Sequence, residues 1–139
     1  MAYVLVADDS PTVRHILTPI LRNANHIVSE AADGLQTLDV LNASLQPMVV
    51  LLDVVMPRLG GIGVLQEMEA SETLRDRHAF ILMTGTPDAI PPRAVAELLE
   101  RFSIPLVVKP IEPPQLLYLV DQAAARLQQA QDQEQENAG

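Results

Sequence analysis

The chain has 139 residues, of which 48% are hydrophobic, and it carries a formal net charge of −9 at pH 7 with no cysteine. This length suits one globular domain, and the lack of cysteine excludes disulfides and thiolate metal sites. The acidic charge argues against direct binding to nucleic acid, and no apolar run reaches the roughly 20 residues of a membrane-spanning helix. We therefore expect a cytoplasmic protein that contacts neither nucleic acid nor a membrane.

Short apolar runs alternate with longer amphipathic segments along the chain. The apolar runs predict five strands, at residues 3–7, 26–30, 48–53, 79–84 and 105–109. Helical spacing predicts five helices between and after them, at residues 11–23, 34–45, 61–75, about 88–101 and 114–131. Three of the runs are almost wholly apolar, which is typical of parallel strands covered on both faces. The order predicts an α/β fold, a doubly wound five-stranded parallel sheet flanked by five helices, with the flavodoxin-like strand order 2-1-3-4-5.

Two further features concern the helices at either end of the chain. Ser10 and Pro11 form a good cap and first-turn pair, whereas Pro19 removes a backbone hydrogen bond inside the same helix and is expected to bend it. The segment 128–139 is rich in glutamine and has three acids and no base. We expect a domain at residues 1–127, followed at 128–139 by an acidic tail or linker without regular structure.

Functional side chains stand at the carboxyl ends of four predicted strands: Asp8 and Asp9, then Asp53, Thr84 and Lys109. Doubly wound sheets bind ligands outside the carboxyl ends of their strands, and in the flavodoxin-like order the site lies between strands 1 and 3. The three aspartates are therefore expected to lie close together.

Clustered carboxylates raise one another's pKa, and a divalent cation offsets their repulsion. Ligand sets made only of oxygen favour Mg²⁺, which often shares its shell with a phosphate. A lysine and a hydroxyl nearby suit a phosphoryl group, and a carboxylate can accept that group as an acyl phosphate. Asp53 is the predicted nucleophile because it stands alone at its strand end, which leaves Asp8 and Asp9 to hold the metal.

Four sequence motifs carry a resemblance to a known family. "ADDS", "LLDVVMPRLGG", "LMTGT" and "VVKP" follow one another in the order and approximate spacing of receiver domains of two-component response regulators. The resemblance covers roughly residues 3 to 127. It implies that Asp53 is the phosphoacceptor, that Asp9 and the Val55 backbone carbonyl bind Mg²⁺, and that Asp8 supports the metal through water.

The resemblance also assigns roles around the phosphoryl group. It implies that Lys109 and Thr84 contact that group, and that the bond between Lys109 and Pro110 is cis, an isomer largely restricted to proline. It places Val55 and Thr86 beside the path of the water that removes the phosphoryl group. Since valine offers no polar group to orient that water, we expect slow self-dephosphorylation.

The chain departs from the family pattern in the region that usually reports phosphorylation. Leu106 stands where receivers usually carry a tyrosine or phenylalanine that swings inward, and Gly85 stands where alanine is frequent. Pro87, Pro91 and Pro92 crowd the start of the fourth predicted helix. We expect output through a non-standard face between the fourth and fifth helices, without an aromatic swing.

The function that follows is a phosphorylation-switched signalling module rather than an enzyme, with activity limited to its own phosphorylation and dephosphorylation. Its expected partners are a sensor histidine kinase or phosphotransfer protein and an unidentified downstream effector, with a homodimer left open. One alternative is a degenerate receiver that acts as a constitutive interaction domain. A haloacid-dehalogenase-type phosphatase is disfavoured, since that class needs an Asp-x-Asp pair and Asp8 and Asp9 are adjacent.

Overall fold

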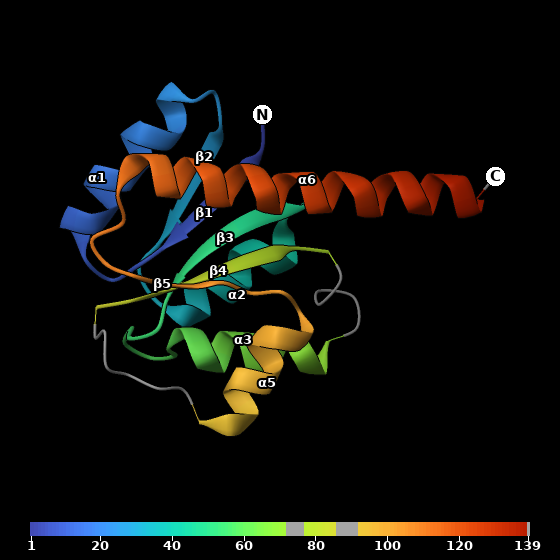
Figure 1. Cartoon of the computed structure of the whole chain (residues 1–139). Coiled ribbons are helices and arrows are strands. Elements are labelled where there is room, and N and C mark those ends of the chain that lie inside the picture. Colours follow the sequence, from blue (N-terminus) through green and yellow to red (C-terminus); the bar gives the residue numbers. More distant parts are fainter. Residues whose placement is uncertain (72–76, 86–91, 139) are drawn as a thin grey trace.

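The computed structural model describes residues 1–71, 77–85 and 92–138 (Figure 1). The elements in chain order are β1 (Tyr3–Ala7), α1 (Pro11–Asn23), β2 (Ile27–Ala31), α2 (Gly34–Ala43), β3 (Met48–Asp53), α3 (Gly61–Ala70), β4 (Ala79–Thr84), α5 (Arg93–Arg101), β5 (Leu106–Val108) and α6 (Pro113–Ala138). The strands pair in parallel in the order β2-β1-β3-β4-β5. The predicted fold class and strand order are confirmed.

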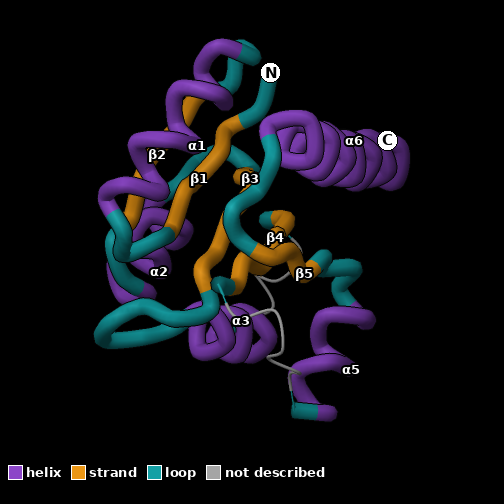
Figure 2. The backbone as a smooth tube through the Cα atoms, turned by 60° about the vertical axis from the view of Figure 1, so that its left-hand side comes forward, coloured by secondary structure: helices purple, strands orange, loops and turns teal. Residues whose placement is uncertain are grey.

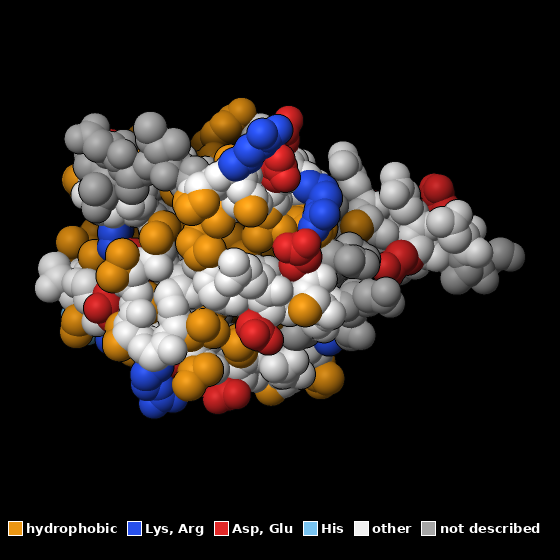
Figure 3. Space-filling model, turned by 90° about the horizontal axis from the view of Figure 1, so that it is seen from below, with side chains coloured by type: hydrophobic (Ala, Val, Ile, Leu, Met, Phe, Trp, Pro, Cys, Tyr) orange, Lys and Arg blue, Asp and Glu red, His pale blue; other side chains and the backbone are white. Residues whose placement is uncertain are grey.

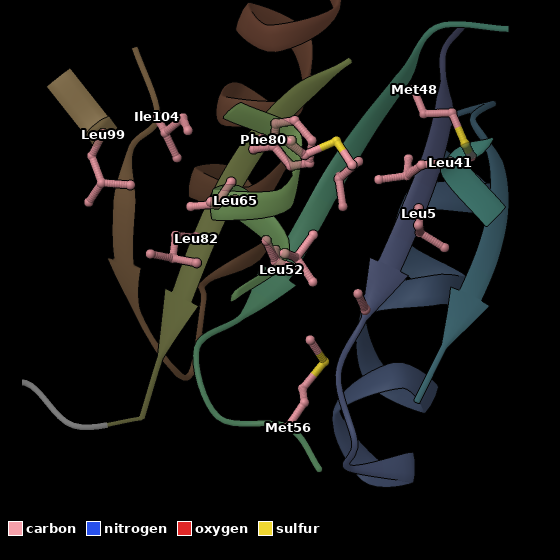
Figure 4. Close-up of a cluster of buried hydrophobic side chains, with 14 of the residues drawn as sticks. Leu5, Leu41, Met48, Leu52, Met56, Leu65, Phe80, Leu82, Leu99 and Ile104 are labelled. Carbon is pink, nitrogen blue, oxygen red and sulfur yellow. The ribbon is translucent and has the colours of Figure 1, made fainter. Parts of the chain in front are cut away.

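Helices cover both faces of the sheet, with α1 and α6 on one side and α2, α3 and α5 on the other (Figures 1 and 2). Successive residues of a strand point to opposite faces. Thus Val4 and Val6 pack with α1 and α6, whereas Leu5 packs with the other layer. Figure 4 shows Leu52, Leu65 and Leu82 of this second core gathered between the sheet and α3. All six residues of β3 are buried, which explains its unbroken apolar sequence.

The helix α5 lies at the outside of the second layer, and a groove of about 260 Å³ separates it from α3. Apolar side chains, among them Leu65 and Leu98, line the groove. Figure 3 views this face and shows hydrophobic side chains gathered at its centre, with charged side chains beside them. One ion pair crosses between the two helices, from Arg101 Nη2 to Glu69 Oε1 at 2.8 Å.

Several predicted boundaries shift. β2 begins one residue later than expected, and β5 is shorter, at residues 106–108. α3 ends at Ala70, since Ser71 has an extended backbone, and residues 72–75 of the expected helix lie outside the described residues. α5 runs from Arg93 to Arg101, and the expected helix start near residue 88, with Pro87 and Pro91 beside it, lies outside the described residues. The predicted cap of α1 is confirmed, since Ser10 Oγ accepts a hydrogen bond from Val13 N at 3.3 Å.

The helix predicted at 114–131 is longer than expected, since α6 continues to Ala138, and the expectation of a tail without regular structure at 128–139 is wrong. The first half of α6 is anchored in the core by Leu116, Val120 and Ala123, which are fully buried. Once a helix is nucleated, adding turns costs little, and alanine and glutamine are good helix formers. The end of α6 projects beyond the sheet (Figure 1). A domain boundary at residue 127 stays a prediction. No helix in the described part of the chain has the length and apolar character to cross a membrane.

Candidate functional site

Asp8, Asp9 and Asp53 come together at the carboxyl ends of β1 and β3. Each offers a carboxylate oxygen, and these oxygens all lie within 4.8 Å of one another. The two strands are direct neighbours in register, with Ala7 opposite Leu52, so the residues that follow lie side by side. Asp8 and Asp53 are buried, whereas Asp9 is exposed. The predicted clustering of the three aspartates is therefore present.

Hydrogen bonds hold the backbone and the side chain of Asp8. Its N–H donates to the Ala31 carbonyl at 3.0 Å, and one of its carboxylate oxygens accepts from Ser10 N at 2.9 Å. Its carbonyl accepts from Arg14 Nη1 at 2.5 Å, and Arg14 Nε also pairs with Glu30 Oε1 at 3.1 Å. Arg14 thus ties the loop after β1 to β2. Sequence reasoning missed this arginine, although its position one turn after the Ser10 cap is a usable signal.

Lys109 reaches into the acid cluster from the end of β5. Its Nζ lies 3.0 Å from Asp8 Oδ2 and 3.3 Å from Asp53 Oδ2. Its backbone N–H donates to the Thr84 carbonyl at 2.8 Å, which fixes the base of the side chain. The peptide bond between Lys109 and Pro110 is cis, the isomer that the resemblance implies.

Burial, and after it the neighbouring charge of Asp8, raise the pKa of Asp53, while Lys109 and the Val55 N–H lower it, and the balance leaves this pKa at about 6. Burial alone would lower the pKa of Lys109, but its hydrogen bond to Asp8 and the charges of both aspartates leave that pKa raised. One ammonium therefore pairs with two of the three carboxylates. The candidate metal ligands are all carboxylate oxygens, so the site is suited to a hard divalent cation such as Mg²⁺.

Thr84 and Gly85 stand at the end of β4, beside the cluster. Thr84 is buried, and its neighbour in register on β5 is Val108. Among the described residues, a Cβ built on Gly85 would meet only Lys109 Cε, at 4.0 Å, so none of them would clash with alanine at position 85. Thr86 lies outside the described residues.

Two other predicted positions are at the surface. The side chain of Val55 is 73% exposed, and its N–H donates to Asp53 Oδ1 at 3.4 Å. Leu106 on β5 is 37% exposed.

A second ion pair that sequence reasoning missed joins Arg58 Nε in the loop after β3 to Asp33 Oδ2 at the start of α2, at 3.5 Å.

Comparisons with known proteins agree with this fold and identify the family of the chain. The sequence model of the response regulator receiver domain matches residues 4–121. The DNA-binding response regulator MtrA of Mycolicibacterium smegmatis is 30% identical over 130 residues, which cover 94% of this chain and 52% of MtrA. Protein CcdB of Bacillus subtilis is 35% identical over 121 residues, which cover 86% of this chain and 95% of CcdB. The chain spans about half or less of the length of MtrA and of other curated relatives.

Solved structures share the same fold. One is the receiver domain of a sensor histidine kinase from Pseudomonas aeruginosa, described with a magnesium ion coordinated in its active-site cleft. It matches with a TM-score of 0.71 at 20% sequence identity, covering 88% of this chain and 96% of that one. A parallel sheet with an acid cluster and a lysine at its carboxyl edge defines a domain of the receiver class. The chain belongs to the response regulator receiver domain family of two-component systems.

Proposed function

We propose that this receiver is a phosphorylation switch that accepts a phosphoryl group on Asp53 from a sensor histidine kinase or a phosphotransfer protein, with Mg²⁺ as cofactor. The observation that carries the proposal is the position of Asp53, 3.3 Å from Lys109 Nζ and within the acid cluster. This arrangement supplies both a nucleophile and positive charge where a phosphoryl group would arrive.

The residues divide the chemistry among them. A carboxylate oxygen of Asp53 attacks phosphorus, so that a P–O bond forms while the P–N bond to the donor histidine breaks. Lys109 and the Thr84 hydroxyl would contact the phosphoryl oxygens. The oxygens of Asp9, Asp53 and the Val55 carbonyl, with Asp8 acting through water, would hold Mg²⁺, which when bound neutralises charge on the phosphoryl group.

The approach of the donor protein is supported by an apolar groove beside Lys109. The groove has a volume of about 260 Å³ and is lined by Val13, Ile16, Leu17, Lys109, Pro110 and Ile111. Ile16 on α1 is 56% exposed, so the groove continues onto an open apolar surface. A protein partner would cover this surface and bring its phosphohistidine to Asp53.

Output is proposed to pass through the face formed by α5, β5 and α6 to a downstream effector. Leu106, which lies on this face, lacks the ring that an aromatic swing requires. A structure bound to a phosphoryl mimic is expected to keep Leu106 in place, and an inward movement of Leu106 with a shift of α5 would contradict this part of the proposal. A homodimer through this face, a cytoplasmic location and the lack of any activity beyond self-modification stay predictions.

The proposed function is tested by incubating the chain with acetyl phosphate, with and without Mg²⁺, and measuring intact mass over time. The addition of one phosphoryl group only when Mg²⁺ is present is the expected result. A chain that binds no Mg²⁺ and gains no mass would instead be a constitutive interaction domain.

A further inference from the structure

We infer that Gly34 and Arg58 are positioning residues for the metal site, although neither touches it. The loop of residues 54–60 joins β3 to α3 and carries the Val55 carbonyl. The two residues hold this loop against the start of α2 and so set where that carbonyl lies. The inference rests on the proposed function, because it assumes that the Val55 carbonyl binds Mg²⁺.

The near part of the loop is fixed on both sides of Val55. Val54 N donates to the Met83 carbonyl on β4 at 2.9 Å, and Gly61 N donates to the Val54 carbonyl at 3.0 Å. Met56 is buried in the second core (Figure 4). The Val55 carbonyl therefore has little freedom as long as its neighbours stay in place.

The outer part of the loop, at Leu59, is in close contact with Gly34 at the start of α2. A Cβ built on Gly34 would overlap the Leu59 carbonyl oxygen, and it would lie 2.6 Å from Leu59 Cβ and 2.8 Å from the Leu59 carbonyl carbon. Because the obstacle is backbone, a rotamer change at Leu59 cannot relieve the clash. Any larger residue at position 34 must push the loop and α2 apart.

The contact between the loop 54–60 and α2 is also supported by an ion pair and by the backbone conformation of Arg58. Arg58 has a φ of 69°, a left-handed conformation that costs on the order of 1 kcal/mol for a residue other than glycine. Its Nε lies 3.5 Å from the buried carboxylate of Asp33, whose other oxygen caps α2 by accepting from Gln36 N at 2.8 Å. Since Arg58 is half exposed, this pair contributes at most about 1 kcal/mol. Gly34 is therefore expected to matter more than Arg58.

A displacement of Leu59 would be transmitted to the metal site through a few residues of the loop backbone. Pro57 lies between Leu59 and Val55, and its ring fixes φ, so it cannot absorb a backbone shift at that angle. The far end of the loop is also held, since a Cβ on Gly60 would come within 2.6 Å of the Val54 carbonyl oxygen. Pushing Leu59 outward therefore strains the segment that ends at Val55.

The test compares two identical substitutions that meet the same neighbour. Gly34→Ala would collide with the backbone of Leu59, whereas Gly63→Ala would meet only the flexible end of its side chain, starting at Cδ1. The affinity of each variant for Mg²⁺ is measured by isothermal titration calorimetry, and unfolding by urea is followed in parallel. We expect Gly34→Ala to weaken Mg²⁺ binding by roughly tenfold, the scale of outer contacts to metal ligands, while Gly63→Ala leaves it unchanged.

Arg58 provides a second comparison at the surface, where folding is not at risk. Arg58→Gln is expected to weaken Mg²⁺ binding by a smaller factor, roughly two- to threefold, in line with the weak ion pair, and Arg58→Lys to restore most of the loss. If Gly34→Ala does not fold, these two variants decide the question.

The outcomes separate the inference from the proposed function. The inference is overturned if Gly34→Ala binds Mg²⁺ with wild-type affinity, or if Gly63→Ala loses as much affinity as Gly34→Ala. If Gly34→Ala cannot fold, wild-type affinity of Arg58→Gln for Mg²⁺ overturns it. Each of these results leaves the proposed function unchanged. Failure of the wild-type chain to bind Mg²⁺ would instead overturn the proposed function, and the inference with it.

Discussion

Lys109 Nζ lies 3.0 Å from Asp8 Oδ2, although 101 residues separate the two along the chain. The contact joins the end of β5 to the end of β1 across the site, while the same ammonium lies 3.3 Å from Asp53. The lysine thus neutralises part of a buried negative charge even before any ligand binds. Removing the lysine side chain should therefore lower the stability of the metal-free chain and raise its affinity for Mg²⁺.

Lys109→Met is expected to lower the stability of the metal-free chain by about 1–3 kcal/mol, because Asp8 and Asp53 lose a charged partner inside the protein. The same variant should bind Mg²⁺ more tightly than wild type, because no ammonium competes for the carboxylates. Urea unfolding with and without Mg²⁺ measures both effects. Equal stabilisation of both chains by Mg²⁺ would argue against this competition.

Asp53→Asn is expected to stabilise the metal-free chain at pH 7.5 by about 1–3 kcal/mol, since burial holds the pKa of Asp53 near 6 and the folded state disfavours its charge. The folded chain binds this proton more tightly than the unfolded chain, so its ionisation costs stability as pH rises from about 4 to 6. The advantage of the variant should therefore disappear by pH 4. Asp39, which is exposed on α2, provides the matched control Asp39→Asn, and an equal, pH-independent gain in that variant would refute the assignment.

The contribution of His78 to stability should depend on pH in the opposite direction. Burial, with the nearby charge of Arg77, lowers the pKa of His78 to about 4, and its Nδ1 accepts a hydrogen bond from Met48 N at 3.0 Å. The unfolded chain binds the proton more readily, so this histidine costs stability as pH falls from 6.5 to 4. His78→Asn is expected to lose less stability than wild type over this range in urea unfolding. Parallel losses in the two chains would show that His78 does not titrate there.

Val55→Asn is expected to shorten the lifetime of the acyl phosphate. The exposed valine side chain offers no group to orient an attacking water, whereas an amide can do so. The backbone carbonyl of residue 55 is retained, so phosphorylation itself should proceed. Mass spectrometry after removal of the phosphoryl donor gives the lifetime, with Val55→Leu as the apolar control, and identical lifetimes in all three chains would count against the prediction.

Much of the site could be predicted from sequence because its residues follow apolar strands directly. Once strands 1 and 3 are known to be neighbours, Asp8 and Asp53 must lie side by side, and the ladder between β4 and β5 brings Lys109 to the same edge. The Arg58–Asp33 pair could not be predicted in this way, because it depends on how a loop rests on a helix. The helical end of α6 was missed because a polar, acidic composition was weighed above the anchored turns that precede it.

The most direct test of the account is to measure intact mass after incubation with acetyl phosphate and Mg²⁺ for three chains, the wild type, Asp53→Asn and the control Asp39→Asn. One added phosphoryl group is expected on the wild type and on Asp39→Asn, and none on Asp53→Asn. Labelling of Asp53→Asn to the level of wild type would show that Asp53 is not the phosphoacceptor, because the phosphoryl group would then reside on another residue.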